Sequence, residues 1–204
     1  MTWWIVIGVL LLAYFLGSIP TGFIVAKLIQ GIDIRDHGSG NTGATNVFRV
    51  VGRRAGVAVL IADLLKGLAA VLIAHQIIAS QTSLATYWVE TGAGMFVILG
   101  HSRSIWLNFT GGKSAATGLG VLLALAYPVA LGAAAVFAGV FALSKTVSLG
   151  SISAALITPI LMLLTGQPLP FLILALIGGL YVVVRHRSNI SRLLSGTEPK
   201  ISNG

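Results

Sequence analysis

Residues 3–26 read WWIVIGVLLLAYFLGSIPTGFIVA, a stretch without a charged side chain. A transmembrane helix needs about 20 consecutive, mainly apolar residues. Further apolar stretches follow at 55–79, 84–101, 114–128, 129–144, 149–166 and 169–185. Inside a bilayer every backbone amide must find a partner within the protein, and a helix supplies one from its own segment. The sequence therefore predicts an all-α, polytopic membrane protein with about seven transmembrane helices.

The composition leads to the same class of protein. Hydrophobic residues make up 56% of the chain and charged residues 9%, whereas soluble domains carry about 25% charged residues. Lipid is therefore the expected solvent, and residues 1–204 are expected to form a single transmembrane domain. The start, Met-Thr-Trp-Trp, lacks a basic segment, so we interpret the first helix as a retained span. The absence of cysteine excludes disulfides, thiolate nucleophiles and cysteine-type zinc sites.

Basic residues are distributed unevenly among the predicted loops. They lie after the first, third, fifth and seventh spans: Arg35, Arg49, Arg53, Arg54, Arg103, Lys113, Lys145, Arg185, Arg187, Arg192 and Lys200. The alternate loops, around 80–84, Pro128 and 167–170, contain no lysine or arginine. Because positive loops stay in the cytoplasm, the pattern predicts an outer N-terminus and a cytoplasmic C-terminus.

Three predicted cytoplasmic segments combine small, amide and basic residues. They are GSGNTGATNVFR (38–49), NFTGGKSAATG (108–118) and RHRSNISRLLSGTEPK (185–200). Glycines let backbone amides converge on an anion, and hydroxyl, amide and cationic side chains add donors and charge. Turn formation and topology explain one such segment, but they do not explain three on one face. We interpret them as phosphate-binding segments.

Two soluble nucleotide-binding motifs are approximated but incomplete. Residues 38–43 match the dinucleotide pattern, and Asp63 follows at a suitable distance, but a membrane span precedes the motif in place of a strand. Residues 112–114 resemble the end of a P-loop, but Leu107 stands where its first glycine is needed. No nucleic-acid partner is expected either.

Several ionisable residues fall within or near the predicted spans. Asp63 and Lys66 are three residues apart and share a helix face. Charges inside a membrane are costly and usually paired, so we expect a structural ion pair that supports the first polar segment, with a direct catalytic role as the alternative. His101 and His186 end their helices and could cap them, line a site or act as a base. His75 is expected at the outer end, without a role.

Taken in order, these motifs resemble the PlsY family, the bacterial acyl-phosphate:glycerol-3-phosphate acyltransferases. GSIPTGFI (17–24) and DLLKG (63–67) extend the resemblance to nearly the whole chain. It implies transfer of a fatty acyl group from acyl phosphate to the 1-hydroxyl of sn-glycerol 3-phosphate. The products are lysophosphatidic acid and inorganic phosphate, in the first step of phospholipid synthesis. It also implies the bacterial cytoplasmic (inner) membrane, an active site on its cytoplasmic face and contact with membrane lipid. The acyl-phosphate-forming enzyme is a candidate partner, and no cofactor or metal is expected.

The resemblance also assigns roles to residues of the three segments. The residues assigned to catalysis are Ser39, Arg49, Lys113, His186, Asn189 and Glu198. The residues assigned to substrate binding are Gly38, Gly40, Asn41, Thr42, Gly43, Asn46, Gly111, Gly112, Ser114, Thr117 and Arg187. The general base stays open among His186, Glu198 and the phosphate of the donor.

The sequence departs from the family at two places and leaves other functions open. Ser114 stands where the family usually has glycine, and SRSIW (102–106) replaces an aromatic-proline pair. No histidine is followed by aspartate five residues later, so direct attack by the substrate hydroxyl is the simpler path. A transporter or channel for a phosphorylated solute is the main alternative, and a structural scaffold is a third.

Overall fold

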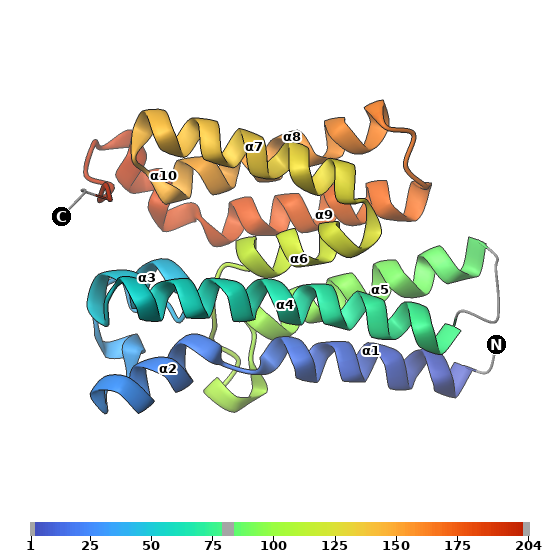
Figure 1. Ribbon diagram of the computed structural model, residues 1–204, viewed down its shortest axis with the longest axis horizontal. Helices are drawn as coiled ribbons and strands as arrows, with labels where there is room; N and C mark the ends of the chain where they lie inside the picture. The colour runs from blue at the N-terminus through green and yellow to red at the C-terminus, as the bar shows by residue number, and fades with distance from the viewer. Residues whose placement is uncertain (1–2, 79–83, 202–204) are drawn as a thin grey trace. The chain divides into compact units, whose positions relative to one another are not determined.

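The computed structural model describes residues 3–78 and 84–201, and these ranges form helices joined by short loops (Figure 1). The helices are α1 (Trp3–Ser18), α2 (Thr21–Gln30), η1 (Ile34–Asp36), α3 (Ala44–Val50), α4 (Arg53–Ile78), α5 (Leu84–Ser102), η2 (Ile105–Leu107), α6 (Ala115–Leu125), α7 (Tyr127–Ser144), α8 (Val147–Leu164), α9 (Leu169–Arg185) and α10 (Arg187–Leu194). Within the described ranges the only β pairing is an isolated bridge between Ser104 and Thr110. The predicted all-α class is confirmed.

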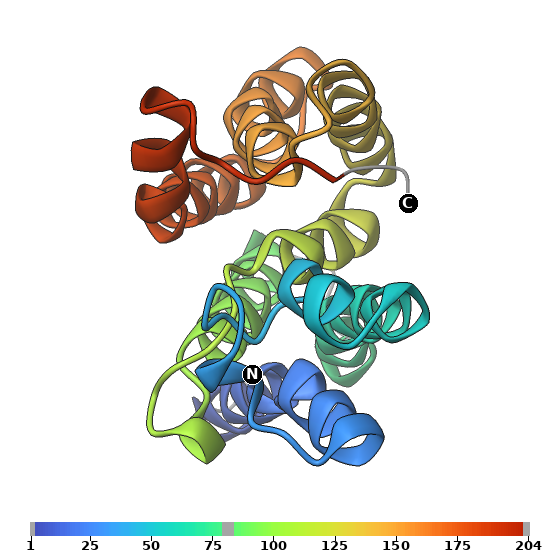
Figure 2. The same ribbon diagram turned by 90° about the vertical axis from the view of Figure 1, so that its left-hand side faces the viewer.

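The chain divides into two compact units, Met1–Leu125 and Ala126–Gly204. In the first unit α1 packs against α5 and α4 packs against α6, while α4 also contacts α1 and α5. In the second unit α8 contacts both α7 and α9, and α10 contacts α9. Figure 2 shows these helices nearly end-on. The polar segments predicted to bind phosphate are thus divided between two separately packed units.

Glycines bring the helices of the first unit together. A side chain at Gly67 or Gly120 would collide with the facing backbone where α4 crosses α6. A side chain at Gly17 or Gly100 would do the same where α1 crosses α5. Small residues at helix crossings allow close packing in membranes, where the hydrophobic effect gives helices little reason to associate. These crossings fix the helices that carry the polar segments.

Among the described residues, four helical segments are long and apolar enough to cross a membrane, counting α1 and α2 as one. They are Trp3–Gln30, Arg53–Ile78, Tyr127–Ser144 and Val147–Leu164, and α9 with α10, bent by 59°, would be a fifth. The third and fourth predicted spans coincide with α5 and the 11-residue α6, which are outside that set. The count of seven and the orientation therefore stay predictions, and residues 79–83 of one predicted outer loop lie outside the described residues.

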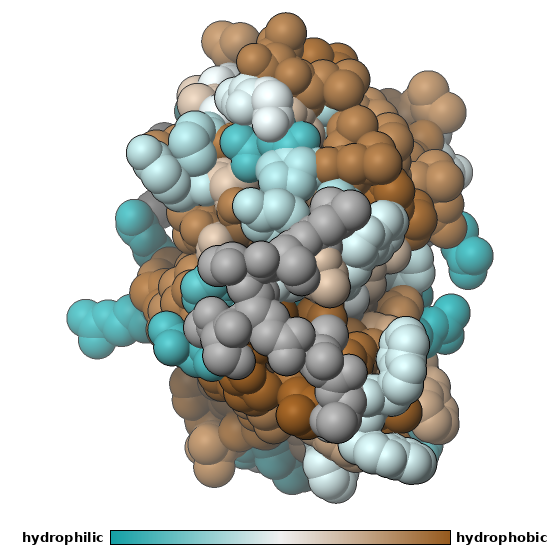
Figure 3. Space-filling model, turned by 90° about the vertical axis from the view of Figure 1, so that its right-hand side faces the viewer, coloured by the Kyte–Doolittle hydropathy of each residue, from teal (hydrophilic) through white to brown (hydrophobic). Residues whose placement is uncertain are grey.

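Large apolar side chains are exposed on the helices of both units. Leu143 and Leu164 of the second unit are 90% and 77% exposed, and Leu65 in the middle of α4 is 51% exposed. Figure 3 shows brown apolar side chains over much of the described surface on one face. A soluble protein does not expose apolar surface on this scale. The surface is suited to contact with lipid.

Short helices lie in or next to the polar segments, where the sequence predicts loops. They are α3 and η1 near the first segment, η2 before the second and α10 in the tail. The first predicted span is also broken between α1 and α2, because Pro20 has no backbone N–H to continue a helix. A small core beside this break joins α2, η1, α3 and α4: Ala26, Ile34, Val47, Ala55 and Val59. That core anchors the first polar segment.

Candidate functional site

One buried amide organises the first loop, residues 38–43. The Asn46 side chain is 3% exposed. Its Oδ1 accepts a hydrogen bond from the Ser39 amide at 2.9 Å, and its Nδ2 donates to the Asn41 and His37 carbonyls at 2.9 and 3.0 Å. A weaker bond reaches the Ile34 carbonyl at 3.3 Å. Asn46, predicted to bind substrate, holds the loop in shape.

The exposed part of the first loop lies around Ser39. Gly38 and Gly40 have φ angles of 59° and 67°, which glycine adopts without strain. Ser39 and Arg49 are exposed and accessible to a soluble ligand. By contrast, Thr42 is 6% exposed and lines a small cavity inside the unit. The first loop therefore has an accessible rim, formed by Ser39 and Arg49, and a buried inner side at Thr42.

The Asn41 side chain closes a turn at the end of this loop. Its Oδ1 accepts a hydrogen bond from the Gly43 amide at 2.8 Å, just before α3 begins. Its Nδ2 donates a long hydrogen bond of 3.5 Å to the carbonyl of Gly111. The side chain therefore joins the first loop to the second.

Arg35 is one of four arginines near the first loop, but its guanidinium is already engaged. Arg35 Nη2 lies 2.6 Å from Asp33 Oδ2, and the guanidinium also lies over the Phe23 ring. The hydrogen bond from Arg35 lowers the pKa of Asp33, although burial opposes the shift. Arg35 is therefore held in place by Asp33 and Phe23.

The second loop, residues 108–114, packs tightly against His101 at the end of α5. The Gly112 amide donates to the His101 carbonyl at 3.1 Å. A side chain on Gly111 would collide with that carbonyl, and one on Gly112 would collide with the imidazole ring. The loop needs both glycines because His101 leaves no room for a β-carbon.

The three predicted site residues that follow the double glycine, Lys113, Ser114 and Thr117, differ in burial. Lys113 is half-buried. Ser114 has a φ angle of 64° and donates through Oγ to the Ile98 carbonyl at 3.0 Å, with the side chain 1% exposed. Thr117 is fully buried where α6 crosses α4. Of these three predicted site residues, only Lys113 has side-chain atoms near the surface.

In the second unit, the tail folds around the carboxylate of Glu198. This group accepts hydrogen bonds from Asn189 at 2.5 Å, Ser148 at 2.7 Å and Arg192 at 2.7 Å. Burial would raise the pKa of Glu198, but these three donors outweigh it and hold the pKa below its usual value. Glu198 is therefore an engaged anion at neutral pH. The sequence analysis assigned no role to Ser148 or Arg192.

His186 lies at the junction of α9 and α10 and is 4% exposed. Its Nδ1 lies 2.8 Å from the Val182 carbonyl, which can only accept a hydrogen bond, so Nδ1 carries the proton. In the neutral ring the unprotonated nitrogen is then Nε2. Arg187, the next residue, is exposed. The role of His186 as a base stays a prediction.

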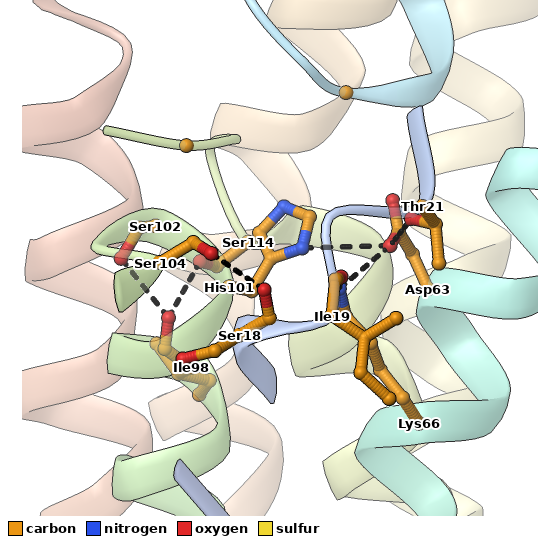
Figure 4. Close-up of polar contacts among 12 residues, drawn as sticks. Ser18, Ile19, Thr21, Asp63, Lys66, Ile98, His101, Ser102, Ser104 and Ser114 are labelled. Atoms are coloured by element: carbon orange, nitrogen blue, oxygen red, sulfur yellow. Dashed lines mark hydrogen bonds and ion pairs between the residues drawn. The ribbon is translucent and has the colours of Figure 1, made fainter. Parts of the chain in front are cut away.

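The predicted ion pair in α4 is confirmed, with Lys66 Nζ 2.9 Å from Asp63 Oδ1 (Figure 4). Two further residues contact the same carboxylate, and the sequence did not predict these contacts. Thr21 Oγ1 donates to Asp63 Oδ1 at 2.5 Å, and His101 Nδ1 lies 3.5 Å from the same oxygen. In the part of the chain that is described, no three His, Cys, Asp or Glu residues are grouped as metal ligands.

Apolar helices, exposed apolar surface and polar loops define a multi-pass helical membrane protein. The family model described as glycerol-3-phosphate acyltransferase matches residues 7–196. Curated relatives of that name include one from Acaryochloris marina, 50% identical over 98% of this chain and 94% of the relative. Another, from Gloeobacter violaceus, is 47% identical over 100% of this chain and 98% of the relative.

Two solved structures are similar along nearly the whole chain. Both are crystal structures of PlsY (YgiH), an integral membrane glycerol 3-phosphate acyltransferase. The glycerol 3-phosphate form has a TM-score of 0.89 and 40% identity, covering 97% of this chain and 96% of that one. The lysophosphatidic acid form has a TM-score of 0.87 and 39% identity, covering 97% and 95%. The chain belongs to the glycerol-3-phosphate acyltransferase (PlsY) family, which confirms the resemblance found in its motifs.

Proposed function

We propose that the protein transfers a fatty acyl group from acyl phosphate to the 1-hydroxyl of sn-glycerol 3-phosphate. The products are lysophosphatidic acid and inorganic phosphate, and the reaction is the first step of bacterial phospholipid synthesis. Family membership supports an acyltransferase over a transporter. Similar structures described as glycerol 3-phosphate and lysophosphatidic acid forms support the acceptor and the product.

The observation that carries this proposal is the connection between the two glycine loops of the first unit. Asn41 of the first loop donates to Gly111 of the second, and Lys113 follows the double glycine directly. Backbone amides, hydroxyls and cations are the donors that phosphate groups require. We assign acyl-phosphate contacts to Ser39 and Arg49 on the accessible rim, with Asn41, Thr42 and Gly43 shaping the loop. Lys113 is assigned to neutralising phosphate charge.

The chemistry requires no covalent enzyme intermediate. The 1-hydroxyl oxygen attacks the acyl carbonyl carbon and loses its proton to a base. The bond from that carbon to the phosphate oxygen then breaks, and phosphate leaves with the electron pair. Acyl phosphate is already an activated mixed anhydride. The enzyme therefore contributes mainly orientation of the substrates and stabilisation of the developing negative charge.

The proposed base is His186 or the phosphate of the acyl donor. His186 carries its proton on Nδ1, which leaves Nε2 as the accepting nitrogen. Glu198 fits this role less well, since three donors engage its carboxylate. We assign Glu198 instead to positioning Asn189, and we assign Arg187, which is exposed, to substrate phosphate.

We propose one acyltransferase domain over residues 1–204, because the family model extends from residue 7 to residue 196 and thus into both compact units. We also propose the bacterial cytoplasmic membrane, with the active site on the cytoplasmic face. No metal or cofactor is invoked for the reaction. The enzyme that forms acyl phosphate is the proposed partner, because its product is water-labile and membrane-bound.

The function is tested with purified protein, palmitoyl phosphate and labelled glycerol 3-phosphate. We expect labelled lysophosphatidic acid and release of one phosphate for each acyl group transferred. Palmitoyl-CoA should not replace palmitoyl phosphate, and a chelator should leave the rate unchanged. Robust turnover with palmitoyl-CoA alone would contradict the proposed donor. Loss of activity on chelation, restored by one specific metal, would contradict a metal-free mechanism.

The orientation is tested with reporters fused to the intact chain. Basic residues concentrate in alternate predicted loops, so a reporter after Gly204 should be cytoplasmic and one at Gln81 should be outside. An activity reporter that works only on one side of the membrane distinguishes the two positions. Both reporters on the same side would exclude an odd number of spans.

A further inference from the structure

The break between α1 and α2 is fixed by side chains from other elements. Helix α1 ends at Ser18, Ile19 follows it, and Pro20 cannot donate a hydrogen bond to continue the helix. Ser104 Oγ donates to the Ser18 carbonyl at 2.6 Å, and Lys66 Nζ donates to the Ile19 carbonyl at 3.0 Å. The Ile19 carbonyl also accepts from the Thr21 amide at 3.0 Å, and such pairing is what backbone groups in an apolar segment require. The break is therefore a built feature with assigned partners.

One oxygen atom of Asp63 gathers groups from three helices at this break. Asp63 Oδ1 accepts from Thr21 of α2 and from Lys66 of α4, and it faces His101 Nδ1 of α5 (Figure 4). The side chains of Asp63, Lys66 and His101 are only 2%, 7% and 7% exposed. A buried ion pair adds little net stability, because desolvation offsets its attraction. The pair instead orients the groups around it.

His101 carries this arrangement to the second loop. Its backbone carbonyl accepts from the Gly112 amide, and its ring leaves no space for a β-carbon on Gly112. Asp63 faces Nδ1 of the same ring. Rotation of the ring would therefore move the second loop, which carries Lys113. A cavity of about 10 Å³, roughly the size of one water molecule, lies here between Lys66, His101, Thr42 and Gly111.

We propose that Asp63 is a positioning residue for acyl transfer. It holds the His101 ring in one orientation, and the ring holds the double glycine and hence Lys113 where charge develops. This inference rests on the proposed acyltransferase function. Asp63 touches no substrate in this scheme, and it acts on the reaction only through His101 and the second loop.

The first unit contains a matched control. His75 Nδ1 lies 2.5 Å from Glu90 Oε1, and the Glu90 side chain is 7% exposed. This pair also joins α4 to α5 through a buried carboxylate and a histidine. His75 lies in the last turn of α4, whereas Asp63 lies in its first half and faces the last turn of α5. Of the two pairs, the Asp63 pair is the one beside the glycine loops.

The first experiment compares Asp63→Asn with Glu90→Gln in the full-length protein. For Asp63→Asn we expect kcat to fall more than about tenfold while KM for glycerol 3-phosphate changes less than about threefold. Hydrogen exchange of residues 108–118 should become faster, because the loop loses its orienting ring. Glu90→Gln should keep kcat within about twofold and leave that exchange unchanged. Equal effects of the two variants on both measurements would overturn the proposal.

The second experiment tests whether Asp63 acts through His101. His101→Gln alone and Asp63→Asn/His101→Gln together should have the same kcat within about twofold, because the ring is already gone. Multiplication of the two single effects would contradict the scheme. If Asp63→Asn does not fold, Thr21→Val removes one donor from the same carboxylate oxygen and should accelerate loop exchange; unchanged exchange overturns the proposal. Loop exchange is measured without substrate, so it remains decisive even if the wild-type protein fails to transfer acyl groups.

Discussion

The two glycine loops of the first unit are held by different forces. Four hydrogen bonds from the Asn46 side chain shape the first loop, and backbone groups accept or donate all of them. The second loop has close contact between Gly111, Gly112 and His101, where a side chain would have no room. Water can replace hydrogen bonds to exposed backbone, but it cannot relieve a steric collision.

The difference has consequences for tolerance to substitution. The hydrogen bonds of the Asn46 side chain can be lost one at a time, so the first loop should lose its conformation gradually. A close-packed contact has no intermediate state, because interiors do not deform continuously. The second loop should therefore tolerate substitution less well than the first, although both contribute donors to the proposed phosphate site.

Gly112→Ala should have the largest effect. Its β-carbon would overlap the His101 ring, whose Cε1 and Cδ2 atoms would lie at 2.8 and 3.0 Å. The loop or the His101 ring must move, and we expect kcat/KM to fall more than about a hundredfold in the acyl-transfer assay. Gly118→Ala is the control, because a β-carbon at this α6 position meets nothing within 4 Å. Similar activity of the two variants would show that the contact with His101 does not determine loop position.

Lys113→Ala should have the next largest effect, through charge instead of shape. Hydrogen bonds to charged groups contribute about 1.5–3 kcal/mol, which corresponds to roughly ten- to a hundredfold in rate. Lys113→Arg should also lose activity, because a planar guanidinium does not replace a compact ammonium beside two glycines. Membrane insertion should stay normal, as measured by the yield of folded protein.

The control for Lys113 is Lys145→Ala. Lys145 caps α7, and its carbonyl accepts from the Ile201 amide, a bond that alanine would retain. We expect near wild-type acyl transfer from this variant. If Lys113→Ala and Lys145→Ala behave alike, Lys113 only anchors the topology and the second loop does not belong to the active site.

Asn46→Ala should weaken the first loop by a smaller factor. Ser39 loses the acceptor for its amide, and the Asn41 and His37 carbonyls lose their donor. Because residues 38–40 of this loop are exposed, water can satisfy some of these groups. We expect a fall of about tenfold in kcat/KM, mainly through a higher KM for palmitoyl phosphate. A fall as large as that of Gly112→Ala would remove the distinction between the two loops.

The sequence predicted the helices better than their interruptions. Apolar length revealed the long helices because transfer into lipid depends on composition over many residues. The break at Pro20 was missed because residues 3–26 are apolar throughout, although a proline within a helical pattern is itself a signal for a break. Helix α3 was missed because it lies within a segment rich in glycine, threonine and asparagine.

The site was predictable as a set of residues but not as a set of contacts. Motif resemblance selected Asn46 and Glu198, yet their hydrogen bonds to neighbouring groups depend on how the chain folds back. Ser148 lies fifty positions before Glu198 and has no local signal that links it to that carboxylate. Asp63 and Lys66 were paired correctly, because i and i+3 positions meet on any helix. The sequence predicted contacts within one helix, but it did not predict contacts between distant residues.

The smallest effect is expected at Ser114, where strain and a hydrogen bond oppose each other. Its φ angle of 64° favours glycine, the residue that the family resemblance implies at this position. A non-glycine residue in this region costs roughly 1–2 kcal/mol. In this chain the Ser114 hydroxyl donates to the Ile98 carbonyl, and such a bond contributes about 0.5–1.5 kcal/mol. The two contributions nearly cancel.

Ser114→Gly should therefore change the free energy of unfolding by less than about 1 kcal/mol, since it removes the strain and the bond together. Ser114→Ala keeps the strain and loses the bond, so it should be less stable than serine by about 0.5–1.5 kcal/mol and less stable than glycine by about 1–2 kcal/mol. Thermal unfolding of the detergent-purified protein would rank the three residues. An alanine variant as stable as the serine protein would mean that the hydroxyl does not support this loop. A strongly destabilised glycine variant would mean that the positive φ angle carries no strain, and that the second loop depends on the serine as much as on its double glycine.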